Sequence, residues 1–312
     1  QRSVLIHNKA QTQSVFVWLF AIIAGGAFLT LFFSITASQQ SAMETRTLET
    51  NSDLLQNLIQ LLITTTSAEQ EIPAPPRDVI FTCLSGDSFI NHEFYYEGAT
   101  RDSPVPGLPV FTPTELPNTP WKLTSTEIDI GHPVGQAVYI TPLDYAIPIN
   151  PSVSTQVKRL INETRFNYTE DPTGPRVTLN AIRPQPQDPV FYYGDVTYAD
   201  GSAVSWIGKD LLLGALLSNS SNLYTCNQKK VENLLRASVN ITLKRAEYLA
   251  TSLPRSGDNS CYVAYQRAVP GLQNLQSQTS FSRNPNGYIQ AALQVHRQKT
   301  GVLQVQSCPS LY

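Results

Sequence analysis

The feature that most constrains this chain is an uncharged stretch near its N-terminus. No Asp, Glu, Lys or Arg occurs from Ala10 to Met43. Within it, Val15 to Ile35 are 21 residues of almost unbroken apolar character. A helix of that length would reach about 32 Å, which matches the hydrocarbon core of a bilayer. The sequence therefore predicts a span that tethers the remaining chain to a membrane or to the hydrophobic core of a filament.

The length and flanks of this stretch predict a retained anchor and its orientation. The apolar region of a cleaved secretory signal is usually about 7 to 15 residues long, which is shorter than the stretch found here. Arg2 and Lys9 precede the apolar run, and the first charge after it is Glu44. Because cationic flanks stay in the cytoplasm, we expect a cytoplasmic N-terminus and an extracellular C-terminal domain.

Four sequons occur on the side predicted to be external. They begin at Asn162, Asn167, Asn219 and Asn240. Asn in this motif accepts N-linked glycans in exported proteins, so all four are candidate glycosylation sites. Asn240 falls within a predicted helix, where a glycan requires an exposed face.

The chain has four widely spaced cysteines, Cys83, Cys226, Cys261 and Cys308, without a C-x-x-C pair. This spacing does not fit a zinc site and predicts two disulfides in an oxidising compartment, with buried free thiols as the alternative. Cys226 precedes a predicted helix of about 26 residues, roughly 39 Å long, and Cys261 follows it. We therefore expect Cys226 and Cys261 to pair with Cys83 or Cys308 rather than with each other.

Composition implies no polyanionic partner and allows a large folded region. The 22 basic and 24 acidic residues give a net charge of −2, so nothing favours nucleic-acid binding. About 240 residues follow the predicted stalk, enough for one large or two small domains. The 22 prolines, with abundant Thr, Ser, Gln and Asn, indicate a β-containing extracellular protein.

The segment from Thr36 to Thr66 contains neither Pro nor Gly, which predicts that the span continues as a helical stalk. Leu48, Leu55 and Leu62 are spaced by seven residues along it. This apolar side can pack on the protein's own domain or form a self-associating stalk.

Small residues inside the span would permit close helix contact. They are Ala21, Ala24, Gly25 and Gly26.

A β-rich region is predicted after the stalk, from β-branched and aromatic content. The expected strands cover 78–84, 88–96, 121–130, 136–141 and 176–182, with a helix over 152–164. Six prolines between 102 and 120 predict a surface loop there.

The C-terminal part is predicted to hold a hairpin followed by helices. The hairpin covers 190–207 with Asp200-Gly201 in a type I′ turn. Helices are expected over 227–252, 260–278 and 285–299, the last capped by Asn284 and stopped by Gly301, before a strand over 302–305.

The expected fold class is α+β. In chain order we expect a cytoplasmic tail over 1–13, a transmembrane helix over 14–35, a stalk over 36–71, a β-rich part over 72–188 and a hairpin-plus-helix part over 189–312.

Catalytic patterns are weak. The sequence has no G-x-S-x-G, H-E-x-x-H or Gly-rich phosphate loop, and the segment from Trp206 to Asp210 lacks the residues of a nucleotide motif. His92 and Glu93 would face opposite sides of a strand, and His132 reads as a turn residue. Local capping accounts for Asp87, Asp195 and Asp200, and packing accounts for much of the aromatic runs at 94–96 and 191–193. We expect no catalytic, cofactor or metal site.

Several segments resemble a group of archaeal single-pass surface proteins from small-genome symbiotic lineages, to which no activity is assigned. One is Asn8-Lys9-Ala10-Gln11 before the span. The others are 80–83, 111–116, 139–142, 206–215 and 224–227. The resemblance implies an archaeal envelope origin and no mechanism.

The architecture also resembles type IV pilin-like subunits, although about 14 mostly polar residues precede the apolar helix here. The sequence thus favours a membrane-anchored extracellular structural or interaction protein, with a filament subunit second and a membrane-tethered hydrolase third. Expected partners are membrane lipid and, through the N-terminal helix, other copies or envelope proteins.

Overall fold

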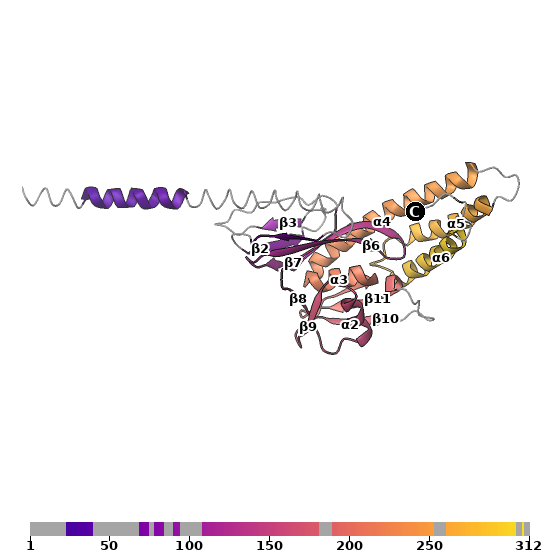
Figure 1. Ribbon diagram of the computed structural model, residues 1–312, viewed down its shortest axis with the longest axis horizontal. Coiled ribbons are helices and arrows are strands. Elements are labelled where there is room, and N and C mark those ends of the chain that lie inside the picture. The colour runs from indigo at the N-terminus through magenta and orange to yellow at the C-terminus, as the bar shows by residue number, and fades with distance from the viewer. Residues whose placement is uncertain are drawn as a thin grey trace, which may run out of the picture. The chain divides into compact units, whose positions relative to one another are not determined.

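The computed structural model describes residues 23–39, 69–74, 78–83, 90–93, 108–180, 189–252, 260–303 and 308. The chain forms two compact units, 1–53 and 54–312, which are taken separately below (Figure 1).

The described part of the first unit is a helix over residues 23–39. Its large apolar side chains are 49 to 77% exposed. They are Ile23, Phe28, Leu29, Leu31, Phe32, Phe33 and Ile35. The hydroxyls of Thr30 and Thr36 donate to carbonyl oxygens one turn earlier, on Gly26 and Phe32. The hydroxyl groups of Thr30 and Thr36 are therefore satisfied by the backbone of the helix itself.

The span and stalk predictions fall largely outside the described residues. Of the helices that the structure describes, none is both long and apolar enough to span a bilayer. Residues 14–22 of the predicted span, including Ala21, and residues 40–68 of the predicted stalk over 36–71 lie outside the described ranges. The stalk prediction is wrong at its end, because residues 69–71 belong to strand β1 (Glu69–Ile72) and pair antiparallel with residues 122–124. Ala24, Gly25 and Gly26 lie on the helix over 23–39, and an added Cβ at either glycine would meet nothing within 4 Å.

The second unit is α+β, as predicted. Its largest described sheet has the order β1-β6-β7-β4. β6 and β7 form a long antiparallel hairpin, β1 pairs antiparallel with β6, and β4 adds in parallel to β7. These strands are β1 (Glu69–Ile72), β6 (Trp121–Asp129), β7 (Pro133–Pro142) and β4 (Val110–Phe111).

Three smaller sheets complete the described β structure, with the orders β3-β2-β5, β10-β11-β12 and β8-β9. The first comprises β2 (Val79–Cys83), β3 (Ile90–Glu93) and β5 (Glu115–Leu116). The second comprises β10 (Arg176–Asn180), β11 (Tyr193–Thr197) and β12 (Ala203–Ile207). The parallel pair β8 (Ala146–Ile149) and β9 (Asn167–Glu170) is joined through α2 (Thr155–Asn162), and a 3-10 turn, η1, covers Pro189–Phe191.

Helix α3 (Gly208–Ser218) lies at the centre of this unit. It begins directly after β12 and contacts strands of three sheets together with α2, α4 and η1. Every residue of α3 except Lys209 is buried. A helix that is apolar on all sides is typical of a protein core. The sequence analysis did not predict this helix.

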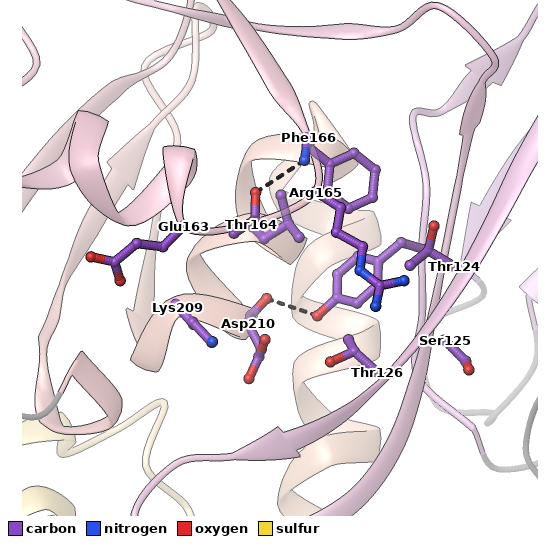
Figure 2. A pocket seen from close by; sticks show the side chains of 11 residues that line it. Thr124, Ser125, Thr126, Glu163, Thr164, Arg165, Phe166, Lys209 and Asp210 are labelled. Carbon is purple, nitrogen blue, oxygen red and sulfur yellow. Dashed lines mark hydrogen bonds between the residues drawn. The ribbon is translucent and has the colours of Figure 1, made fainter. Parts of the chain in front are cut away.

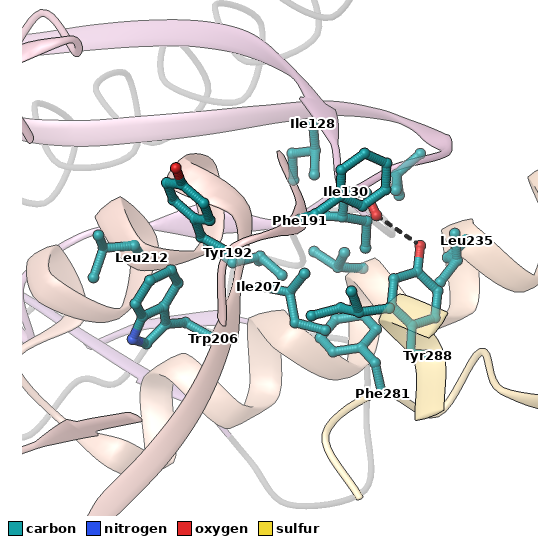
Figure 3. Close-up of a cluster of buried hydrophobic side chains, with 14 of the residues drawn as sticks. Ile128, Ile130, Phe191, Tyr192, Trp206, Ile207, Leu212, Leu235, Phe281 and Tyr288 are labelled. Atoms are coloured by element: carbon teal, nitrogen blue, oxygen red, sulfur yellow. Dashed lines mark hydrogen bonds between the residues drawn. The ribbon is translucent and has the colours of Figure 1, made fainter. Parts of the chain in front are cut away.

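Three longer helices follow, α4 (Ser221–Ser252), α5 (Ser260–Ser277) and α6 (Pro285–Leu303). They pack in chain order, α4 on α5 and α5 on α6. Figure 3 shows side chains of β6, η1, β12, α3, α4 and α6 meeting in one core, where the Tyr288 hydroxyl donates to the Ile130 carbonyl at 3.1 Å. The core cluster runs from Phe111 to Val295, so the predicted parts 72–188 and 189–312 share it.

The predicted surface loop over 102–120 is wrong for its second half. Val110 and Phe111 form β4 and are fully buried, and Leu116 is buried in β5. Side chains of α4 satisfy the backbone here: Val110 N–H donates to Asn227 Oδ1 at 3.0 Å, and Lys230 Nζ donates to the Leu108 carbonyl at 3.3 Å. These bonds replace a sheet ladder that a proline-rich segment cannot complete alone.

The hairpin is confirmed, but its predicted type I′ turn is wrong. Gly201 N–H donates to the Tyr198 carbonyl at 3.0 Å, which makes Ala199 and Asp200 the central residues. Of Asp200 and Gly201, only Gly201 has a positive φ, of 82°. This is a type I turn followed by a glycine bulge.

The predicted ends of the other helices and strands are confirmed in part. The Asn284 cap is confirmed by a 3.0 Å bond from Gly287 N–H to Asn284 Oδ1. The predicted stop at Gly301 and strand from Val302 are wrong for the described residues, because α6 continues to Leu303. The predicted strands at 78–84, 121–130, 136–141 and 176–182 and the helix at 152–164 are confirmed with shifted ends.

One disulfide joins Cys261 at the start of α5 to Cys308, with Cα atoms 5.4 Å apart. It agrees with the expectation that Cys261 pairs with Cys83 or Cys308. Cys226 lies inside α4 rather than before it and is also disulfide-bonded. α4 contacts β2, which carries Cys83.

Peptide mapping of the unreduced full chain should recover Cys261 linked to Cys308. Because the chain has four cysteines, we expect Cys226 in a peptide linked to Cys83. Mass spectrometry before and after reduction measures both linkages. A peptide containing Cys226 joined to Cys261 would contradict this arrangement.

Gly214→Ala should destabilise the protein, although this exchange inside a helix usually stabilises by about 1 kcal/mol. A Cβ at Gly214 would lie 2.6 to 2.8 Å from ring atoms of Phe111. Such overpacking costs about 1 to 3 kcal/mol. Urea denaturation of the full chain measures the loss, and adding Phe111→Leu should recover part of it. A more stable Gly214→Ala variant would contradict the close contact.

Candidate functional site

A pocket of about 130 Å³ lies between strands β6 and β7, the loop after α2 and the first turns of α3 (Figure 2). Its lining combines hydroxyl groups, two cations, two carboxyl groups and three larger apolar or aromatic side chains. The lining residues are Thr124, Ser125, Thr126, Tyr139, Glu163, Thr164, Arg165, Phe166, Lys209, Asp210 and Leu213.

Strand register explains which β6 side chains face α3. Thr124 stands opposite Tyr139 of β7, and Thr126 stands opposite Ala137. Directly opposite residues share a face of the sheet, and both β7 residues belong to the core beside α3. The Tyr139 hydroxyl donates to the Asp210 carbonyl at 3.1 Å, the bond drawn in Figure 2. The register therefore brings Thr124 and Thr126 to the start of α3.

Asp210 is the most perturbed acid at this site. Its side chain enters the pocket from the first turn of α3, and the residue is only 7% exposed. Burial raises the pKa of Asp210 to about 6, although the charge of Lys209 and a hydrogen bond from the Asp129 backbone act in the opposite direction. Among the ion pairs of the described residues, none involves Asp210.

Positive charge lines the mouth of the pocket. Arg165 is exposed and its Nη1 lies 3.1 Å from Glu69 Oε1, while Lys122 Nζ lies 3.3 Å from Glu69 Oε2. Burial works against ionisation of Glu69, but hydrogen bonds and charge from Arg165 and Lys122 hold its pKa below the ordinary value. Lys209, half-buried beside Asp210, supplies a second cation.

The hydroxyl groups differ in whether their hydrogen bonds are satisfied. Thr164 Oγ1 donates to the Ile161 carbonyl at 2.6 Å and accepts from Phe166 N–H at 3.2 Å. Thr124 is 4% exposed, and its Oγ1 has no hydrogen-bond partner. A buried hydroxyl left in this state costs about 1 to 3 kcal/mol. The pocket thus holds an unsatisfied donor and acceptor.

The chemistry of this lining suits a small polar ligand. No group of three or more His, Cys, Asp and Glu side chains among the described residues could hold a metal ion. The volume equals that of about four water molecules and is below the roughly 300 Å³ of common ligand pockets. A compact group with both donors and acceptors fits these limits.

His132, one of the histidines singled out by the sequence, does not line this pocket. His132 lies in the bend between β6 and β7, as predicted, and is 1% exposed. Its Nε2 is 3.2 Å from Ser238 Oγ, which donates to the Pro133 carbonyl at 2.8 Å. His132 therefore connects the bend to α4. The side chains of His92, Glu93 and Asp87 lie outside the described part of the structure.

The sequon asparagines lie in different settings. Asn162 and Asn167 are exposed near α2 and β9. Asn219 ends α3 with a φ of 41° and accepts from Thr114 N–H and Oγ1, both at 3.0 Å. Asn240 is half-buried on α4, where its Oδ1 accepts from Gln276 Nε2. Glycosylation of all four remains a prediction.

Two further groups of residues agree with structural roles. Phe191 and Tyr192 are buried in the core, whereas the aromatic run at 94–96 lies outside the described residues. The local capping predicted for Asp200 is confirmed, because its carboxylate accepts from Ser202 Oγ at 2.6 Å. For Asp195 it is wrong, because Asp195 lies within β11 and accepts from Ser205 Oγ of the neighbouring strand at 2.7 Å.

The pocket itself was missed by the sequence analysis. The segment from Trp206 to Asp210, dismissed as a nucleotide motif, is the turn from β12 into α3 that delivers Lys209 and Asp210. A carboxyl at the start of the apolar run from Leu211 to Leu217 was the one available indication.

Comparison with protein-family models, with curated proteins and with solved structures gave no match to this chain.

Asp210→Asn should remove a pH dependence of stability. An ordinary aspartate titrates near 3.8 and the folded Asp210 near 6, so the folded state holds the proton more tightly. The resulting stabilisation is complete below about pH 4 and is lost as pH rises to 6. At about 1.4 kcal/mol per pKa unit, it amounts to roughly 3 kcal/mol. Denaturation from pH 4 to 7 measures the difference between the two proteins, and a constant difference would contradict the raised pKa.

Proposed function

We propose that this chain is a membrane-anchored structural or interaction protein of an archaeal-type cell envelope, with its C-terminal domain outside the cell and without enzymatic activity. The observation that carries the proposal is the helix over 23–39, whose seven large apolar side chains are exposed.

Such a helix needs an apolar environment. Burying apolar surface stabilises by about 25 cal/mol per Å², so seven exposed large side chains represent a substantial unrealised gain in water. The hydroxyls of Thr30 and Thr36 are bonded to the helix backbone and do not oppose transfer from water. The uncharged sequence from Ala10 to Met43 extends this property beyond the described helix.

The C-terminal unit supports an exported location. The Cys261–Cys308 disulfide is typical of oxidising compartments. The exposed asparagines Asn162 and Asn167 would be accessible to a glycosylation enzyme. The cationic residues Arg2 and Lys9 before the apolar stretch favour a cytoplasmic N-terminus.

A surface-filament subunit is the second proposal, because a filament core would cover the same apolar helix as lipid does. Gly25 and Gly26 leave space for close approach of a second helix. A membrane-tethered hydrolase gains no support from His132, whose bond to Ser238 serves the packing of a turn on α4.

Phe28→Lys combined with Phe32→Lys should release the protein from membranes, because each charge at the centre of a span costs about 2.5 to 3.5 kcal/mol. The measurement is the fraction of full chain that stays with membranes after alkaline carbonate washing. Ile241→Lys, at a side chain 70% exposed on α4, is the matched control and should remain bound.

The same membranes distinguish the two proposals. Mild detergent should yield a small particle if lipid covers the helix, whereas a filament would persist as a long polymer in electron micrographs. Wild-type protein recovered entirely in the soluble fraction, without polymer, would contradict both.

A further inference from the structure

We propose that the pocket between β6, β7, the loop after α2 and α3 binds a vicinal diol, carried by a small polyol or by a terminal sugar residue. This inference does not depend on membrane anchoring. It rests on four properties of the pocket: unsatisfied polar groups, balanced charge, an apolar wall and small size.

Two polar groups at the pocket are buried, and the hydrogen bond that Asp210 accepts from the Asp129 backbone leaves its carboxylate room for further donors. Asp210 is 7% exposed and forms none of the described ion pairs, and the hydroxyl of Thr124, 4% exposed, has no hydrogen bond. Strand register places Thr124 on the sheet face that carries Tyr139 and faces α3. A ligand that donates to the carboxylate, and toward which the buried Thr124 hydroxyl turns to exchange a hydrogen bond, would satisfy both.

The charges at the pocket balance, which disfavours a simple cation or anion. Lys209 and Arg165 oppose Asp210 and Glu163, and in Figure 2 the Lys209, Asp210 and Arg165 side chains surround the same space. Each hydroxyl of a diol donates one hydrogen bond and accepts others. One hydroxyl can donate to Asp210 while its neighbour accepts from Lys209 or Arg165.

The remaining wall is apolar. Phe166, the Tyr139 ring and Leu213 are buried and line the pocket. A polyol or sugar presents C–H groups on one side and hydroxyls on the other, which matches this division. The volume of about 130 Å³ admits a three-carbon polyol or the diol edge of one sugar ring rather than an oligosaccharide.

The test uses the full chain in a detergent that carries no hydroxyl groups, because sugar detergents would compete. Saturation-transfer NMR compares glycerol with 1,3-propanediol, which has the same carbon number but no adjacent hydroxyls. Methyl α-mannopyranoside is the second probe. We expect saturation of glycerol or the mannoside and not of 1,3-propanediol. Stronger binding of the mannoside would assign a terminal sugar, and stronger binding of glycerol a free polyol.

Variants connect binding to this pocket. Asp210→Asn should weaken binding at least tenfold. Thr124→Val should weaken binding while raising the thermal midpoint of the ligand-free protein, because it removes an unsatisfied hydroxyl. Thr112→Val is the matched control: Thr112 Oγ1 is also buried without a partner but does not line the pocket. It should leave binding unchanged.

Three results would overturn the proposal. The first is equal saturation of glycerol and 1,3-propanediol, or saturation of no probe, which would indicate that water alone fills the pocket. The second is unchanged binding in Asp210→Asn. The third is an equal loss of binding in Thr112→Val and Thr124→Val. If Asp210→Asn does not fold, the comparison of ligand binding by Thr124→Val and Thr112→Val still tests the proposal.

Discussion

Burial of α3 is the interaction on which the C-terminal unit depends. Five leucines of this helix are at most 4% exposed, and each buried leucine contributes about 1.5 to 3 kcal/mol. Two of its carbonyls also accept side-chain hydrogen bonds: Tyr139 and Tyr198 donate to the carbonyls of Asp210 and Ala215, at 3.1 and 2.8 Å. Because strands of three sheets and helix α4 contact α3, removing it would leave no common surface for them.

This central helix also explains how a proline-rich segment enters the core. Phe111 stacks on Tyr139, with ring centroids 5.5 Å apart, and its ring lies over the backbone at Gly214. A segment with so few ladder bonds must have its backbone groups satisfied elsewhere. Asn219, Asn227 and Lys230, at the end of α3 and along α4, provide those bonds. The pKa of Lys230 is lowered to about 8 by burial, so the amine forms this contact at a cost in desolvation.

Local patterns predicted the elements whose residues determine their own structure, such as the β6 and β7 strands, the Asn284 cap and the hairpin at Gly201. The same local patterns did not predict the elements whose structure depends on residues far away in the sequence. Helix α3 is apolar on all sides and shows no helical period, so periodicity could not separate it from a buried strand. Strand β4 forms because it pairs with β7 and donates a hydrogen bond to Asn227 of α4. The pocket brings together residues from 124 to 213 of the chain. The Asp200-Gly201 pair did not determine the turn type of the hairpin, because of these two residues only Gly201 has a positive φ.

An unsatisfied polar atom alone does not mark a binding site in this protein. Thr112 Oγ1 and Trp206 Nε1 are also buried without hydrogen-bond partners, and neither lines the described pocket. What distinguishes Thr124 is that a buried carboxyl, two cations and an open volume occur beside it. Valine in place of Thr124 and an apolar residue in place of Asp210 would fit a packed core better. Departures from good packing are expected where a surface serves binding, and here they coincide at the start of the helix that organises the fold.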